Sequence, residues 1–298
     1  MGGQATDAAT EAFVAHRDLL FTIAYEMLGS AADAEDVLQE TWLRWVGVDV
    51  GRVDDPRAHL VRITTRQSLN RLRAMRRRRE AYVGQWLPEP LLTSPDVAED
   101  VELAESVSMA LLVVLETLSP TERAVFVLRE VFGAPYEEIA EAVGRSPAAV
   151  RQIAHRARRH VDARRPRRAA SPYEAREVSE SFWRAIETRD LQGLFDVLAP
   201  DVVWVSDGGG LRQAALHPIV GADKVVRLIA GILERADGVV NAHLALLNGG
   251  PALVVRVGGE LDGVVALQVE NGRITGIYYV RNPEKLTRVD RQVPLTLR

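Results

Sequence analysis

The sequence contains no cysteine, which excludes disulfide bonds, thiolate metal sites and a cysteine nucleophile. Its apolar stretches, such as Ala110–Leu115, are far shorter than the roughly 20 residues that span a bilayer. The start of the chain, MGGQATDAATEAF, lacks the basic stretch and apolar core of a secretory signal. We therefore expect a cytoplasmic protein without a membrane partner, and 298 residues are enough for two or three domains.

Lysine is nearly absent, since Lys224 and Lys285 are the only two, and the net charge is only −4. Taken alone, that value argues against a nucleic-acid partner, but the charges are segregated along the chain. Residues 56–79 hold nine arginines and no acid, whereas residues 94–105 hold five acids and no base. A local basic stripe attracts phosphates whatever the net charge, so DNA binding stays open.

Residues 135–161, PYEEIAEAVGRSPAAVRQIAHRARRHV, predict two helices joined by a tight turn. Gly144 suits a left-handed C-terminal cap, and Ser146 with Pro147 supplies an N-cap and a first-turn proline. At 100° per residue, the second helix has one small apolar stripe: Val150, Ile153, Ala154, Ala157 and Val161. The opposite face carries hydrogen-bond donors: Arg151, Gln152, His155, Arg156 and Arg159. This pattern is typical of a DNA-reading helix-turn-helix, and the alternative is an arginine-rich helix of an ordinary helical pair.

Upstream, residues 13–79 predict a separate helical unit. One helix ends at Gly29, a second follows Ser30 with an acidic face and two tryptophans, and Pro56 opens a long basic helix. Three prolines and several acids mark residues 80–105 as a linker. From Tyr173 onward, helices alternate with short β-runs separated by glycine turns at residues 249–250, 258–259 and 271–272. The C-terminal part therefore predicts an α+β domain, with helices packed on a curved antiparallel sheet.

Six motifs resemble those of an extracytoplasmic-function (ECF) sigma factor of RNA polymerase. The two helical units carry GSAADAEDVLQETWLRW and DPRAHLVRITTRQSLNRLR, then LSPTERAVFVLREVFGAPYEEIAEAVGRSPAAVRQIAHRARR. The linker WLPEP, the DGGG segment at residues 207–210 and the NPEKL segment at residues 282–286 resemble the SigJ-like group, which has a C-terminal SnoaL-like domain. Three residues depart from the group's pattern: Asn70 stands where Asp is usual, Leu211 where a basic residue is expected, and Glu284 where Asp is usual.

The resemblance implies a multidomain chain of two all-α sigma domains followed by an α+β, cone-shaped SnoaL-like domain. Residues 1–80 correspond to a region 2 helical bundle, 81–105 to a linker, 106–168 to the region 4 helix-turn-helix and 172–298 to the SnoaL-like regulatory domain. Such a protein binds core RNA polymerase and promoter DNA, is a monomer when free, and is regulated in cis by its C-terminal domain. We expect no enzymatic activity, no catalytic residue, no cofactor and no metal.

The same resemblance assigns roles to residues. The −35 element is read by the donor face of the second helix: Arg151, Gln152, His155, Arg156 and Arg159. The −10 element is contacted by Arg62, Arg66, Arg71 and Arg73, with residues 49–55 as a candidate base pocket. The residues expected to bind the polymerase are Asp33, Asp36, Glu40 and Trp42. An equal alternative is that Trp42 and Trp45 belong to the core of the first helical unit. The regulatory contact falls to Asp207, Gly208, Gly209 and Gly210, with Asn282, Pro283, Glu284, Lys285 and Leu286.

Two other functions stay open on the sequence alone. A ligand-responsive helix-turn-helix regulator needs only one DNA-binding unit and usually acts as a dimer, whereas this chain has two different basic helical units. An enzyme fused to a DNA-binding module needs a catalytic group, and no acid–base pair with interpretable spacing stands out. Whether the SnoaL-like domain holds a small-molecule ligand is not decided by the sequence.

Overall fold

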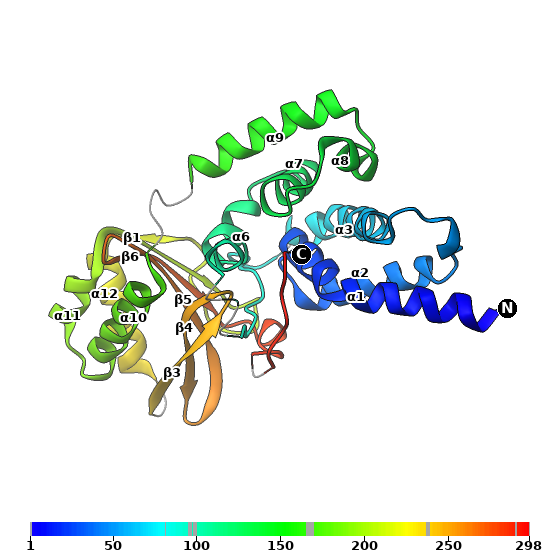
Figure 1. Cartoon of the computed structure of the whole chain (residues 1–298). Coiled ribbons are helices and arrows are strands. Elements are labelled where there is room, and N and C mark those ends of the chain that lie inside the picture. Colours follow the sequence, from blue (N-terminus) through cyan, green and yellow to red (C-terminus); the bar gives the residue numbers. More distant parts are fainter. Residues whose placement is uncertain are drawn as a thin grey trace. The chain divides into compact units, whose positions relative to one another are not determined.

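The computed structural model describes residues 2–80, 82–94, 97, 100–164, 170–236, 239–289 and 291–297, without the side chains of residues 2–6 and 76–80. The chain divides into two compact units, which are described separately (Figure 1). The first unit comprises residues 1–80, 112–164 and 294–298, and the second comprises residues 81–111 and 165–293. No helix in the described part of the chain is long and apolar enough to cross a membrane.

The N-terminal part of the first unit is a bundle of three helices: α1 (Gly2–Leu28), α2 (Ala31–Trp45) and α3 (Pro56–Glu80), with the short 3₁₀ helix η1 (Val50–Arg52) before α3. Gly29 adopts a φ of +67° at the end of α1, and the Ser30 hydroxyl accepts the Asp33 N–H to cap α2. Trp45 is fully buried, and its indole N–H donates to the Ala9 carbonyl at 2.8 Å. This tryptophan therefore belongs to the core of the bundle.

The rest of the first unit holds the end of α6 (Met109–Leu115), α7 (Pro120–Phe126), the π-helical turn η2 (Val127–Val131), α8 (Tyr136–Val143) and α9 (Pro147–Asp162). Gly144 has a φ of 68° and ends α8, while the Ser146 hydroxyl accepts the Ala149 N–H and Pro147 starts α9. The predicted helix–turn–helix is thus confirmed together with its capping residues.

The second unit is built on one six-stranded sheet with the order β2-β1-β6-β5-β4-β3. Its strands are β1 (Leu198–Asp207), β2 (Ile219–Val220), β3 (Val240–Leu247), β4 (Gly250–Val257), β5 (Glu260–Glu270) and β6 (Arg273–Val280). Its helices are α5 (Val101–Ser106), α10 (Pro172–Glu187), α11 (Leu191–Val197), α12 (Ala222–Arg235) and the 3₁₀ helix η3 (Pro283–Lys285). The sequence predicted a purely antiparallel sheet, which is wrong at one place: β1 pairs with β6 in parallel. The strands that the three glycine turns connect are antiparallel, as predicted.

Helices α10, α11 and α12 pack on one face of this sheet around a core that includes Phe182, Trp204 and Ile229 (Figure 1). Alternate residues of a strand point to opposite faces, yet Ala252, Leu253, Val254 and Val255 of β4 are all buried. The sheet is therefore covered on both faces. Within the second unit, residues 91–93 form bridges and hydrogen bonds with the end of β3, so the linker lies against this domain.

Candidate nucleic-acid interface and linker site

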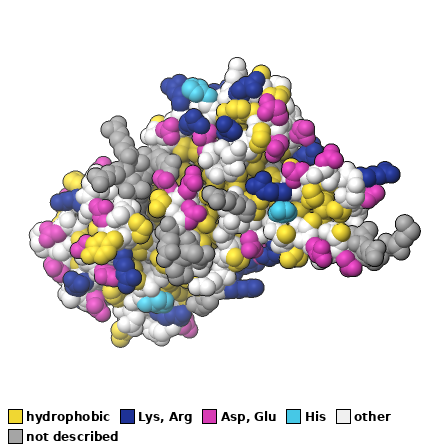
Figure 2. Space-filling model, in the orientation of Figure 1, with side chains coloured by type: hydrophobic (Ala, Val, Ile, Leu, Met, Phe, Trp, Pro, Cys, Tyr) yellow, Lys and Arg dark blue, Asp and Glu magenta, His cyan; other side chains and the backbone are white. Residues whose placement is uncertain are grey.

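The predicted −35 residues share one exposed face of α9. The five side chains are Arg151, Gln152, His155, Arg156 and Arg159, and basic side chains gather over this helix in Figure 2. On the opposite side Val150, Ala154, Ala157 and Val161 are buried, whereas Ile153 is only partly buried. Arg151 lies 3.9 Å from Glu137 and its side chain is 54% exposed, so the ion pair leaves it accessible. The face therefore presents donors on a packed helix, as base readout requires.

The predicted −10 arginines of α3 are not all free in this arrangement. Arg62 donates to the Glu141 carboxylate at 2.9 Å, and Arg66 donates to the Glu141 backbone carbonyl at 2.8 Å. Glu141 belongs to α8 of the helix-turn-helix, whereas Arg73 is exposed on α3. The first unit thus pairs two candidate −10 residues with a residue of the other candidate DNA-binding region.

The loop proposed as a base pocket lines a cavity of about 530 Å³ in the first unit. Its walls include Asp49, Asp55 and His59 on one side and Ile139 and Ala142 of α8 on the other. Burial, with Arg62 and Arg66 nearby, lowers the pKa of His59, so this imidazole is held neutral. Residues 49–55 therefore line one side of a cavity, and α8 lines the other side.

The predicted polymerase-binding residues lie on α2, and two of them are paired with a predicted −10 residue. Arg71 of α3 donates to Asp33 and to Asp36 at 2.6 and 2.7 Å. Although burial opposes its charge, the hydrogen bonds that Arg71 donates to these carboxylates raise its pKa. Arg71 therefore contacts α2, whereas Arg62 and Arg66 contact α8.

The other two polymerase-binding residues of α2 are Glu40, which is exposed, and Trp42, which is partly buried against Phe13 at 5.2 Å between ring centroids. Because Trp45 is core, Trp42 is the tryptophan of this helix that remains accessible.

Arg123 joins the helix-turn-helix part to the N-terminal bundle and is one residue the sequence did not single out. Its guanidinium is 1% exposed, donates twice to the Glu26 carbonyl and pairs with Glu116 at 2.6 Å. Complete burial lowers its pKa to about 9. A buried arginine thus fixes α7 against α1.

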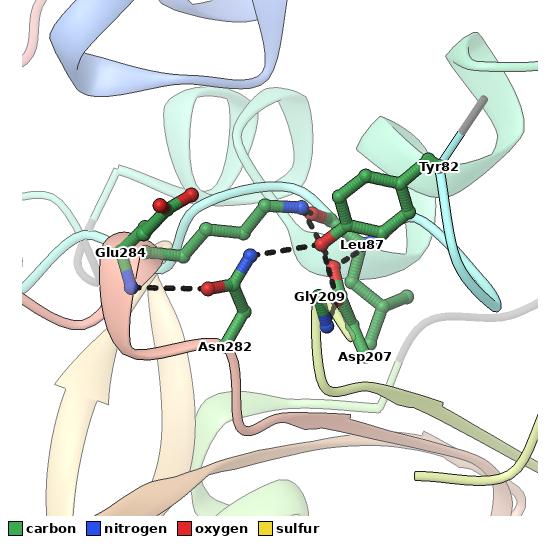
Figure 3. Close-up of polar contacts among 7 residues, drawn as sticks. Tyr82, Leu87, Asp207, Gly209, Asn282 and Glu284 are labelled. Carbon is green, nitrogen blue, oxygen red and sulfur yellow. Dashed lines mark hydrogen bonds and ion pairs between the residues drawn. The ribbon is translucent and has the colours of Figure 1, made fainter. Parts of the chain in front are cut away.

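In the second unit, Asp207 at the end of β1 holds the linker (Figure 3). It is fully buried and accepts hydrogen bonds from the Tyr82 hydroxyl at 2.6 Å and the Leu87 N–H at 2.9 Å. It also accepts from the Gly209 N–H at 3.0 Å and from the Lys285 ammonium at 2.6 Å. Burial, followed by the hydrogen bond to Asp207, raises the pKa of the Tyr82 phenol, so the proton stays on the tyrosine.

Lys285 of η3 holds the same linker segment from a second direction. Its ammonium donates to the Leu87 carbonyl at 2.6 Å and lies 3.2 Å from the centre of the Trp86 ring. The residue is only 6% exposed. A buried charge needs such partners, and here an anion, a carbonyl and an aromatic face supply them. We call Tyr82, Trp86, Leu87, Asp207, Asn282 and Lys285 the linker clamp.

The glycines and Asn282 shape this site. Asn282 donates to the Tyr82 hydroxyl at 2.8 Å and accepts from the Glu284 N–H, so the Asp-to-Glu departure at position 284 leaves that contact unchanged. A Cβ on Gly209 would lie 2.4 Å from the Asn282 amide nitrogen, and Gly209 has a φ of +62°. Leu211, the other departure in this part of the chain, is 59% exposed. The glycines of the DGGG segment are thus explained by close backbone approach, whereas Asp207 acts through its charge.

Beyond the clamp, the linker continues as extended chain. The Leu91 N–H donates to the Asn248 side chain at 3.0 Å, and the Thr93 N–H donates to the Leu246 carbonyl at 2.9 Å. The Asn248 side chain also donates to the Val107 carbonyl at 2.9 Å. The structure therefore brings the DGGG and NPEKL segments together. It also adds partners that the sequence did not identify, which are Tyr82 and Asn248 at the linker and Glu141 in the first unit.

Among the described residues, no group of three or more histidines and carboxylates is arranged to hold a metal ion. Residues 12–79 match the family model described as sigma-70 region 2, and residues 108–161 match sigma-70 region 4. ECF RNA polymerase sigma factor SigJ of Mycobacterium tuberculosis is 38% identical over 92% of each chain. A probable ECF sigma factor, SigI, of the same organism is 36% identical over 94% of this chain and 95% of its own. The crystal structure of M. tuberculosis SigJ matches with a TM-score of 0.75 at 35% identity, covering 94% of this chain and 98% of that one.

Proposed function

Because the chain belongs to the ECF sigma factors, which bind core RNA polymerase and direct transcription from specific promoters, we propose that its C-terminal domain controls when the two DNA-binding regions can separate. The protein is an initiation factor and not an enzyme. Its fold is that of two helical sigma domains followed by an α+β SnoaL-like domain. The proposal concerns which residues act and how the free protein is held inactive.

In this proposal the exposed face of α9 reads the −35 element. Arg151, Gln152 and His155 lie early on the helix and contact base edges, while Arg156 and Arg159 contact phosphates. Arg62, Arg66, Arg71 and Arg73 of α3 hold the phosphates of the −10 element, and the hollow at residues 49–55 takes an unstacked base.

Polymerase docking falls to the outer side of α2. Asp33, Asp36 and Glu40 supply carboxylates beside Trp42, and Leu43 is 70% exposed. An apolar anchor rimmed by carboxylates suits a basic helical partner. Because Arg71 covers two of these carboxylates, docking also requires that this arginine move or share them.

The −10 and −35 elements are centred about 25 base pairs apart, which is about 85 Å at 3.4 Å per base pair. In the first unit, however, Arg62 and Arg66 of α3 contact Glu141 of α8 directly. Regions packed side by side cannot contact both elements at once. We therefore describe this arrangement as closed, and promoter binding requires an open one.

The linker of residues 81–111 joins the two regions and belongs to the second unit. Fully extended, it would reach about 100 Å, enough for the open arrangement. The linker clamp shortens the reach of the linker, because Leu87 cannot extend away from the second unit while its backbone is bound to Asp207 and Lys285. The observation that carries the proposal is the buried ion pair of Lys285 with Asp207, because the Leu87 backbone is hydrogen-bonded to both residues. Holding the linker keeps the two regions at high effective concentration, which favours the closed arrangement.

The test compares Lys285→Met with Lys224→Met, an exposed lysine on α12, in holoenzyme reconstituted with core RNA polymerase and genomic DNA. Transcript 5′ ends are mapped by sequencing. We expect the same start sites for both variants and more transcript from Lys285→Met. Equal or lower yield from Lys285→Met, with α9 amides still protected from exchange, would contradict control by the linker. No start-site-specific transcript from any variant would contradict the residue roles assigned above.

A further inference from the structure

Arg62 and Arg66 are four residues apart on α3, so their side chains lie on one face of that helix. In the first unit this face is turned towards α8, which lies beside α3 (Figure 1). Both guanidinium groups contact the same residue of α8. Arg62 donates to the Glu141 carboxylate at 2.9 Å, and Arg66 donates to the Glu141 backbone carbonyl at 2.8 Å. Two candidate −10 arginines are therefore bound to two acceptors of one residue.

The position of Glu141 near the end of α8 explains why it offers two acceptors. The helix ends at Val143, and Gly144 caps it in the left-handed conformation. The last four carbonyls of a helix have no donor inside the helix, so the Glu141 carbonyl is free to accept from Arg66. These carbonyls also form the negative end of the helix dipole. The carboxylate and the carbonyl of Glu141 thus place negative charge side by side at this end of α8.

These acceptors are chemically similar to those of a nucleic-acid backbone. A guanidinium binds a carboxylate and a phosphate through the same planar set of N–H groups. Arg62 and Glu141 also line the cavity at residues 49–55, and Ile139 and Ala142 of α8 form an apolar part of its wall. In the closed arrangement α8 therefore lies where the proposed function places a strand of the −10 element, with an anion at the arginines and an apolar surface beside the base.

The exposure of this contact favours a competitor over a structural ion pair. The Glu141 side chain is 64% exposed and that of Arg62 is 34% exposed, so solvent and salt screen their attraction. Arg123, in contrast, joins α7 to α1 with a side chain that is 1% exposed. An exposed pair adds little to the stability of the fold, yet it neutralises an arginine that otherwise attracts phosphates. DNA can displace a contact of this kind.

We propose that Glu141 is an internal competitor of promoter DNA, which occupies Arg62 and Arg66 in the closed arrangement and must leave before −10 phosphates bind there. This inference rests on the −10 role that the proposed function assigns to the two arginines. DNA binds only to those molecules in which the arginines are free, so the apparent affinity is reduced by the fraction that is closed. Weakening the contact with Glu141 therefore raises the apparent affinity for a single strand.

The experiment uses the full chain and a fluorescein-labelled oligothymidylate of about twelve nucleotides, which offers phosphates and bases without a particular promoter sequence. Binding is titrated by fluorescence anisotropy. Glu141→Gln keeps the shape of the side chain and removes its charge. At about 50 mM salt, loss of this exposed ion pair should raise the affinity about two- to fivefold. The gain should shrink at about 300 mM salt, because screening already weakens the contact in the unchanged chain.

Two further variants show whether the effect passes through Arg62. Glu138→Gln removes the same charge from an exposed position of the same helix, and none of the described contacts joins Glu138 to Arg62 or Arg66. It should therefore change the affinity much less than Glu141→Gln does. Arg62→Ala should weaken binding of the strand. In that background Glu141→Gln should have no further effect, because the group for which the two anions compete is gone.

The outcomes separate this inference from control by the linker. If Arg62→Ala binds the strand as tightly as the unchanged chain, the assigned −10 role and this inference both fail. If Lys285→Met raises the affinity but Glu141→Gln does not, or if Glu138→Gln raises it equally, Glu141 is not a competitor and the linker clamp stands. If Glu141→Gln raises the affinity but Lys285→Met does not, the competition stands and control by the linker fails. A gain that persists in the Arg62→Ala background overturns the competition, since the carboxylate then acts on DNA without that arginine.

Discussion

Replacing Lys285 by methionine should destabilise the second unit strongly, and the structure sets the magnitude. The ammonium is 6% exposed, pairs with the fully buried Asp207 at 2.6 Å and donates to the Leu87 carbonyl. Methionine keeps most of the apolar volume beside Trp86 but leaves Asp207 without its cation. Removing one partner of a buried ion pair costs about 3–5 kcal/mol. We expect a loss in that range in the free energy of unfolding of this unit.

Native-state hydrogen exchange of the β4 and β5 amides measures this free energy for the second unit alone, which matters because a chain of two units need not unfold in one step. Lys224→Met is the matched control, and at an exposed position it should change the value by less than about 0.5 kcal/mol.

A thermodynamic cycle isolates the pair itself. In an Asp207→Asn background the carboxylate charge is gone, so Lys285→Met should cost only about 1 kcal/mol, the value of an ordinary hydrogen bond. The resulting coupling of about 2–4 kcal/mol lies at or above the upper end of the range for contacting residues. A cost for Lys285→Met no larger than that for Lys224→Met, or additive effects in the cycle, would refute the view that this ion pair holds the linker.

Three further predictions follow from other contacts. Arg151→Ala or Gln152→Ala should weaken −35 binding by roughly 1–3 kcal/mol and relax base preference, whereas Arg159→Ala should weaken binding to all sequences alike and flatten the salt dependence. Fluorescence anisotropy on variant duplexes distinguishes these results. Equal, sequence-independent losses at all three positions would show that the wrong helix face was assigned. Arg123→Met should destabilise the first unit by about 3–5 kcal/mol, against little change for the exposed Arg145→Met, and similar thermal melts of the two would contradict the structural role of Arg123. Burial raises the pKa values of Tyr82 and Tyr279 and raises that of Tyr278 to about 12, so the unfolded chain loses these protons at lower pH than the folded chain does. The free energy of unfolding of the second unit should therefore be constant up to about pH 10 and fall above it, and it should fall less steeply in Tyr82→Phe. A decline that begins near neutral pH would rule this out.

Local signals in the sequence predicted the helix-turn-helix well, because Gly144, Ser146 and Pro147 each act on their own turn of backbone. The buried stripe of α9 followed from helical periodicity for the same reason. Trp42 and Trp45 could not be separated by pattern, since both lie at helical spacing and only tertiary packing buries Trp45 against Ala9.

Non-local pairing accounts for what the sequence did not predict. The parallel pairing of β1 with β6 joins strands about 70 residues apart and leaves no periodic signal. The ion pair of Lys285 with Asp207 and the contact of Arg62 with Glu141 likewise join distant residues. The DGGG and NPEKL segments were found through resemblance, and the structure adds the reason for them. The contacts of Asp262 with Tyr279 and Arg281 were missed for the same reason, because these partners follow on the next strand.

The most direct measurement of the central claim is the distance between the two DNA-binding regions. The chain has no cysteine, so Ala74→Cys on α3 and Ala163→Cys after α9, both exposed, accept spin labels specifically. Double electron–electron resonance on the free protein should give one short, narrow distribution. Addition of Lys285→Met, or of core polymerase with promoter DNA, should shift that distribution to longer distances. An identical short distribution in all three samples would contradict a closed state that the linker clamp maintains.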